Sequence, residues 1–280
     1  MPARTITELS IGIPDEPLLV AREALTDGDA VGLKDPKELD YSSRTGEPQE
    51  VGYNTNIEKQ AQKVSFSSQK KIASLTVRIA KQGSPTDSIK VGIQADSSGS
   101  PSGTFLASFT KAAAAFTSST AFRENLDAVV TLSANTTYWI VFERTGALSD
   151  VNYYQAHAVG GFPSGQESKY LSSSTWTNST MGLYVILWGQ KGVYKAKATT
   201  TAEANAFLGI VDQAVADGAN LPAGSLVIVG YKKKTSWGLT EMSVYYLSDT
   251  AGAISTASGT VQKKIGLSLG TETLVLLNTL

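Results

Sequence analysis

The sequence predicts an all-β protein in which a jelly-roll-like β-sandwich is inserted into a small discontinuous β domain. Short segments rich in β-branched and aromatic residues recur along the chain, and most of them alternate between polar and apolar positions. Clusters of Gly, Pro, Ser and Asp separate these segments, and no long helical pattern lies between them. At 280 residues the chain is also long enough for two domains.

The predicted strands of the insert are bounded by turn chemistry. Turns are expected at 82–86, 96–103 and 160–165. Residues 111–116 could form a helical turn, but six residues make an isolated helix marginal. Strands are expected at 72–79, 88–94, 128–132, 137–142 and 184–188.

The last third of the chain continues the β pattern. Residues 249–252 read as a tight turn, and residues 201–207 are a short helix candidate opened by a threonine cap. Strands are expected at 225–231, 243–247, 261–267 and 273–277.

The domain order is predicted from a divided hairpin. Residues 29–34 end where a hairpin turn should follow, and residues 192–197 have the pattern of the returning strand. We therefore expect residues 41–190 to be inserted at a hairpin tip, and residues 1–40 and 191–280 to form one domain, because insertions are best tolerated at exposed loop tips. Three serial units remain the alternative. The arm at 11–20 could pair with a neighbouring subunit or form the first strand of its own domain.

Composition excludes several functional classes. The 24 basic and 25 acidic residues nearly balance, so electrostatic binding to nucleic acid is not expected. The sequence has no cysteine, no secretory leader pattern and no apolar run long enough for a membrane span, so we expect a soluble protein made in the cytoplasm. The basic run Lys232–Lys234 is expected to be a solvated turn or a lysine-protected edge strand.

No catalytic residue, metal ligand set or cofactor site is predicted. His157 is the single histidine, so neither a Ser-His-Asp arrangement nor a multi-histidine metal site can be assembled. Asp96 is expected to cap its own loop rather than to bind calcium. Glycan hydrolysis by paired carboxylates stays open as a minor alternative. The acids of the insert considered for this role are Asp87, Asp96, Glu124, Asp127, Glu143, Asp150 and Glu167.

Aromatic side chains are the remaining resource for recognition. Residues 150–180 combine aromatic rings with amides and hydroxyls, which suits sugar or protein surfaces, although some rings could instead plug the sandwich ends. Trp139 and Trp188 lie within strand patterns and are expected in the core. The candidate recognition residues are Tyr153, Tyr154, Phe162, Tyr170 and Trp176.

Two segments of the chain resemble modules of tailed-bacteriophage virion proteins. Residues 24–31, 193–196, 206–211, 244–254 and 261–269, in this order, resemble a small β domain of such proteins. Residues 91–106 and 132–141 resemble a carbohydrate-binding-like jelly-roll domain of phage fibres and bacterial surface proteins. The large insert and the basic segment 232–238 depart from the usual pattern of the small domain.

The resemblance implies a virion structural protein of the head-decoration, head-fibre or tail-fibre type, made in the host cytoplasm. Its expected partners are capsid or tail proteins and a host surface glycan, with neither nucleic acid nor membrane. A homotrimer is implied by the resemblance. The alternatives are a tail-fibre receptor-binding protein, a virion-associated glycan depolymerase and a free bacterial surface-glycan-binding module. Head or tail placement stays open.

Overall fold

The computed structural model describes residues 20–42, 47–116, 121–159, 167–222, 226–227 and 230–277. The chain divides into two compact units. The carrier unit comprises residues 1–34 and 191–280, and the sandwich unit comprises residues 35–190. The expected all-β fold class is confirmed, because both units are built on antiparallel sheets and the described helical elements are short.

The predicted hairpin that frames the insert is present. Strand β1 (Ala30–Lys34) pairs antiparallel with β15 (Gly192–Lys195), with Val31 opposite Lys195 and Lys34 opposite Gly192. The sandwich unit therefore leaves and rejoins the carrier unit at two directly paired residues. The boundary between the units lies at 34/35, whereas the sequence suggested 40/41, because residues 37–41 already form a strand of the sandwich.

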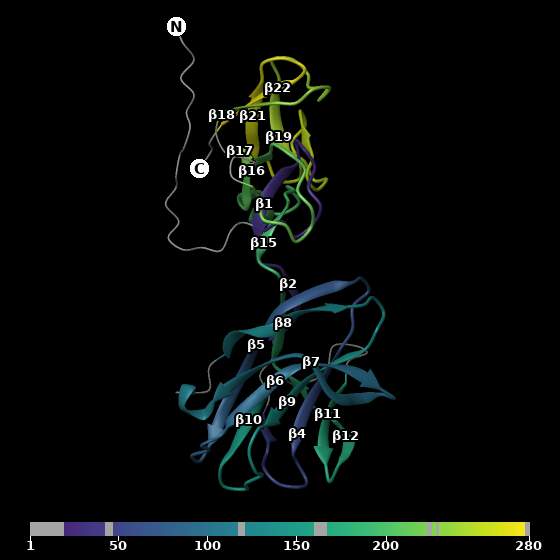
Figure 1. The fold of residues 1–280 in the computed structure, drawn as a ribbon, viewed down its shortest axis with the longest axis vertical. Coiled ribbons are helices and arrows are strands. Elements are labelled where there is room, and N and C mark those ends of the chain that lie inside the picture. The colour runs from purple at the N-terminus through teal and green to yellow at the C-terminus, as the bar shows by residue number, and fades with distance from the viewer. Residues whose placement is uncertain are drawn as a thin grey trace. The chain divides into compact units, whose positions relative to one another are not determined.

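Two antiparallel sheets enclose the core of the sandwich unit (Figure 1). The seven-stranded sheet consists of β2 (Lys37–Tyr41), β3 (Pro48–Val51), β5 (Lys70–Gln82), β8 (Ala121–Leu132), β10 (Tyr153–Val159), β13 (Gly182–Leu183) and β14 (Val185–Gly189). The six-stranded sheet has the order β12-β11-β4-β9-β6-β7. Its strands are β4 (Lys59–Val64), β6 (Ser88–Ser97), β7 (Ser100–Ala112), β9 (Tyr138–Arg144), β11 (Ser168–Ser172) and β12 (Thr175–Ser179).

Alternation along the strands decides which side chains reach the core. On β9, Ile140 and Phe142 belong to the main core, whereas Trp139 and Val141 pack with Ala61 on the other face of the sheet. The expectation that Trp139 packs in a core is confirmed. This ring is fully buried, but it lies in a separate cluster outside the main core.

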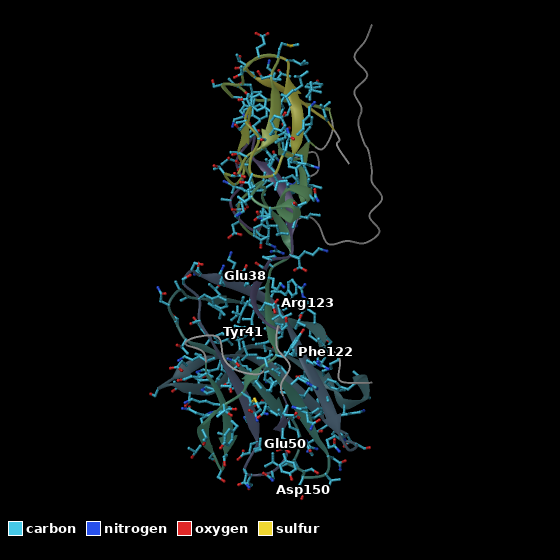
Figure 2. The ribbon with its side chains drawn as sticks, turned by 180° about the vertical axis from the view of Figure 1, so that it is seen from behind. Glu38, Tyr41, Glu50, Phe122, Arg123 and Asp150 are labelled. Carbon is cyan, nitrogen blue, oxygen red and sulfur yellow. The ribbon has the colours of Figure 1, made fainter. Side chains whose placement is uncertain are left out.

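Trp188 is not a core residue, contrary to the prediction. It lies one position after Leu187 on β14, so its ring faces away from the core that Leu187 enters. The ring is half-buried, its Nε1 donates to Thr76 Oγ1 at 2.8 Å, and the Arg123 guanidinium carbon lies 4.3 Å from the ring centroid. Figure 2 labels Arg123 and its neighbour Phe122 on β8.

The carrier unit contains two smaller sheets. The four-stranded sheet adds β16 (Phe207–Val211) and β17 (Leu226–Val227) to the β1–β15 hairpin. The five-stranded sheet consists of β18 (Gly230–Lys233), β19 (Val244–Leu247), β20 (Ile254–Ser255), β21 (Lys264–Ser268) and β22 (Thr273–Leu276). A shared core cluster, including Ala30, Ile210, Tyr245 and Leu274, draws side chains from both sheets.

The helical elements are short. Helix α1 (Thr201–Asn205) begins at the expected threonine cap, because Thr200 Oγ1 accepts a hydrogen bond from Glu203 N at 3.2 Å. The expected turn at 111–116 is a 3₁₀ helix, η1 (Ala113–Ala115), that follows the long strand β7. No helix in the described ranges is long and apolar enough to span a bilayer.

Lys232 is buried, which corrects the expectation of a solvated basic turn. Its side chain is 3% exposed and its Nζ pairs with Asp27 at 2.6 Å and with Asp212. Lys234 Nζ also reaches this corner, where it donates to the Asp27 carbonyl at 2.6 Å. The edge-strand part of the expectation holds, since β18 is the terminal strand of its sheet. Lys233, between the two, is exposed.

Candidate binding site

The structure separates the five predicted recognition residues. Tyr154 is fully buried in the sandwich core, and its hydroxyl donates to the Asp87 carbonyl at 2.9 Å, so the prediction of surface recognition is wrong for this residue. Burial first, and then the Asp87 charge, raise the pKa of the Tyr154 hydroxyl. Phe162 lies outside the described residues. Tyr153 is half-buried and packs edge-on against Tyr53, with 4.9 Å between ring centroids.

Tyr170 and Trp176 share one hairpin. Strand β11 pairs with β12 so that Leu171 lies opposite Trp176 and Tyr170 lies opposite Thr177. Because neighbouring residues of a strand point to opposite faces, Tyr170 and Trp176 lie on different faces of this hairpin. The turn is formed by Ser173 and Ser174, both in the left-handed region with φ of 45° and 68°. This is the geometry of a two-residue hairpin turn.

The Trp176 face is an aromatic cluster on the outside of the six-stranded sheet. Trp176 and Phe105 are half-buried against the buried group Ala61, Trp139 and Val141. The ring of Trp139 is held by its Nε1, which donates to Asp96 Oδ1 at 2.7 Å. The cluster is therefore well packed, and little of its aromatic surface is free for a ligand.

Asp96 caps its own turn, as the sequence predicts. Its Oδ2 accepts from Gly99 N at 3.0 Å, while its Oδ1 accepts from the Trp139 indole. Both carboxylate oxygens are thus used by the fold. Among the described residues, no group of three or more His, Asp or Glu side chains is placed to hold a metal ion.

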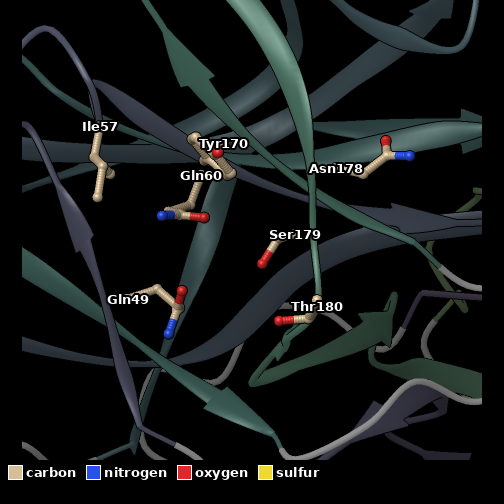
Figure 3. Close-up of a pocket in the computed structure, with 7 residues that line it drawn as sticks. All are labelled: Gln49, Ile57, Gln60, Tyr170, Asn178, Ser179 and Thr180. Carbon is tan, nitrogen blue, oxygen red and sulfur yellow. The ribbon is translucent and has the colours of Figure 1, made fainter.

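The Tyr170 face opens onto a pocket of about 320 Å³ (Figure 3). It lies where β3 of the seven-stranded sheet approaches β4, β11 and β12 of the six-stranded sheet. The lining is one aromatic ring, one aliphatic side chain and five amides or hydroxyls, and none of these side chains is charged. The lining residues are Gln49, Ile57, Gln60, Tyr170, Asn178, Ser179 and Thr180.

Gln60 is the buried polar group of this pocket. It is 2% exposed, and its Nε2 donates to the Glu50 carbonyl at 3.0 Å, which ties β4 to β3. This bond fixes the orientation of the carboxamide, because only the amide nitrogen can donate. The Oε1 atom is buried and has no hydrogen-bond partner in the described part of the chain. Figure 3 shows the carboxamide oxygen turned toward the space beside Ser179 and Tyr170.

Gln62, on the same strand, has hydrogen-bond partners for both the nitrogen and the oxygen of its carboxamide. It is also buried, and its Nε2 donates to the Glu167 carbonyl at 3.0 Å. Its Oε1 accepts from Leu183 N at 2.8 Å. The two glutamines are neighbours on one face of β4, so the unpartnered oxygen of Gln60 is a property of the pocket and not of the strand.

The pocket lies away from the connection to the carrier unit. The chain enters the sandwich beside Glu38, and Figure 2 shows Glu38 and Asp150 at opposite ends of the sandwich unit. Glu50, the neighbour of pocket residue Gln49, is labelled nearer to Asp150 than to Glu38. The pocket is therefore on the part of the sandwich unit that is farther from its attachment.

The acidic side chains considered for catalysis have structural partners. Asp150 is exposed, and the other six are held by basic groups, an amide or an indole and not by a second carboxylate. These interactions are Asp87–Arg144, Glu124–Lys111, Asp127–Ser108 N, Glu143–Lys59, Glu167–Lys63 and Asp96–Trp139. His157 is half-buried on β10, where burial and the nearby Arg78 lower its pKa.

Sequence comparison adds no relative that could assign a ligand. No protein-family model matches the chain, and no curated protein matches it.

Proposed function

We propose that this chain is a structural component of a phage particle. The carrier unit attaches to the virion, and the sandwich unit is displayed as a capsid decoration, head fibre or adhesion module. The resemblance of residues 24–31, 193–196 and 244–254 to a virion domain supplies the phage assignment. The function is binding, with affinity from buried apolar area and strand pairing.

The single observation that carries this proposal is the divided hairpin. The whole sandwich is connected through Lys34 and Gly192, which are direct partners in the β1–β15 ladder. A unit inserted in this way can vary or be lost without interrupting the core of its carrier. This organisation suits a protein that keeps one attachment domain and displays another.

An apolar stripe on the carrier unit supports attachment through this unit. Tyr231, Val275, Leu267 and Val244 are successive cross-strand partners on β18, β22, β21 and β19. Tyr231 is 72% exposed, and the other three are partly exposed. Cross-strand partners point to the same face, so the stripe offers apolar area to a virion protein or to a second copy in a homotrimer.

Virion association is tested on purified particles of the phage whose genome encodes the chain. We expect mass spectrometry to find the chain in washed particles, and antibodies against residues 35–190 to label them. Tyr231→Ser should reduce incorporation, whereas Met242→Ser, which alters an exposed apolar residue outside the stripe, should not. Absence of the chain from washed particles would refute the proposal.

A receptor-binding role in a tail fibre is the second candidate, and the uncharged pocket is the observation that favours it. Labelling of tails in place of heads would select this role. A depolymerase would shorten purified host surface glycan on incubation. We expect no shortening, because six of the seven acids considered for catalysis are held by other groups of the fold.

A further inference from the structure

We propose that the pocket at Gln60 and Tyr170 binds one uncharged sugar unit of a glycan. The inference rests on the proposed function to the extent that a displayed sandwich needs a target. The lining of the pocket supports sugar binding independently of the hairpin and of any resemblance.

The buried side-chain oxygen of Gln60 lacks a hydrogen-bond donor among the described residues. A buried carbonyl oxygen without a hydrogen bond is costly, and native proteins rarely leave one unsatisfied. The Nε2 atom is already engaged by Glu50, so the free Oε1 can only accept. The ligand must therefore bring an O–H or N–H group to this position. Sugar hydroxyls and an N-acetyl amide both meet this requirement.

The rest of the lining selects for a neutral, hydroxyl-rich group. Gln49, Ser179 and Thr180 can donate as well as accept, which matches the double character of a sugar hydroxyl. With no charged side chain among the lining residues, the pocket offers no partner for a carboxylate or phosphate. The ring of Tyr170 supplies an apolar surface for the C–H face of a sugar.

The size of the pocket fits one sugar ring. Its volume of about 320 Å³ lies at the small end of ligand pockets. A longer glycan would place one unit in the pocket and extend over the surface. Only the unit in the pocket would contact Gln60.

The test uses the full chain and simple sugars. Methyl glycosides of glucose, galactose and mannose, together with N-acetylglucosamine, are screened by saturation-transfer NMR, and any that binds is titrated by calorimetry. We expect at least one to bind with a dissociation constant of about 1 mM or tighter. Glucuronic acid and sialic acid are the charged comparisons and should bind at least about tenfold more weakly.

Variants assign the binding to the pocket. Gln60→Met keeps the length of the side chain and removes the acceptor, so affinity should fall about tenfold. Thr180→Val alters an exposed lining residue that the core does not need, and it should weaken binding about threefold. Trp176→Phe, on the opposite face of the same hairpin, is the matched control and should change affinity less than about twofold.

Three results would overturn the inference: no neutral sugar binds, charged sugars bind equally well, or Gln60→Met and Thr180→Val both bind like the unmodified chain. If Trp176→Phe alone abolishes binding, the outer aromatic cluster is the site and the pocket is not. Failure here with the chain still present in particles would remove the sugar site and leave the virion proposal intact. Sugar binding by a chain absent from particles would do the reverse.

Discussion

Replacing Lys232 by methionine tests how the carrier unit is held together. The Lys232 ammonium on β18 joins Asp27, which precedes the insert, to Asp212, which follows β16. It therefore links both sheets of the unit and both of its chain segments. Burial lowers the pKa of Lys232, but the hydrogen bonds to Asp212 and Asp27 outweigh this effect and raise it overall.

The magnitude follows from the exposure of the partners. Each hydrogen bond to a charged group contributes about 1.5–3 kcal/mol. The side chains of Asp27 and Asp212 are 39% and 49% exposed, so water recovers part of this loss. Methionine retains the apolar contacts of the lysine stem. We expect Lys232→Met to lower the free energy of unfolding of the carrier unit by about 2 kcal/mol.

The assay must resolve the two units, because a chain with two units need not unfold in one step. Hydrogen exchange followed by mass spectrometry, in increasing urea, reports peptides of the carrier and sandwich units separately. Lys233→Met is the matched control, since Lys233 is exposed on the same strand, and it should change stability by less than about 0.5 kcal/mol. Equal effects of the two substitutions would refute the reasoning.

The same ion pairs predict a pH dependence. Because the pKa of Lys232 is higher in the folded state than its ordinary value of 10.5, its stabilising effect is fully present below that value. The effect is lost as the pH rises through the folded pKa. The unmodified carrier unit should therefore lose stability in the alkaline range, and Lys232→Met should lose less over the same range.

Three further substitutions probe the fold. Gly32→Ala places a Cβ 2.4 Å from the Ala206 carbonyl oxygen, so the carrier unit should lose about 1–3 kcal/mol in urea unfolding, and an unchanged midpoint would contradict the close approach of β1 to β16. Arg144→Met removes the buried partner of Asp87 and should cost the sandwich unit about 3 kcal/mol by the same measurement, whereas a loss below about 1 kcal/mol would show that the pair is solvated. Trp176→Ala should cost about 1–2 kcal/mol by chemical denaturation, because the ring is only half-buried, and a cost near 4 kcal/mol would place it in a core.

The sequence predicts the fold class and the framing hairpin better than the surface between residues 150 and 180. No strand was predicted where β10, β11 and β12 form, and four of the five residues of β12 are Ser, Thr or Asn, which favour turns. Their turn, Ser173-Ser174, has positive φ at both positions without glycine, so the usual Asn-Gly signal of a two-residue hairpin is absent.

The candidate site was only partly predictable. Tyr170 was identified from its aromatic and polar surroundings, but Gln60 was not. The available signal was the run Gln60-Ala61-Gln62, in which period-two alternation places two amides on the face of β4 that also carries the core residue Val64. Strand β13 supplies a donor to the side-chain oxygen of Gln62, whereas β3 offers Gln60 only a carbonyl acceptor. This difference arises from tertiary packing and leaves no signal in the sequence.

Tyr154 and Lys232 show why the burial of a polar side chain could not be predicted from the sequence. The surroundings of each residue in the sequence are polar, and the structure buries both. Tyr154 donates to Asp87, far away in the sequence, and Lys232 pairs with Asp27 across the insert. Buried polar groups need such partners, and partners brought together by folding leave no local pattern.

Cryo-electron microscopy of particles carrying a deletion variant most directly tests the proposal that the carrier unit attaches to the virion and displays the sandwich unit. Replacing residues 35–191 by Asn-Gly closes Lys34 onto Gly192 with a two-residue turn that suits paired strands. Particles complemented with this variant should keep density for the carrier unit and lose density for the sandwich unit. A variant that folds in isolation but is missing from particles, when the full chain is present in them, would contradict attachment through the carrier unit.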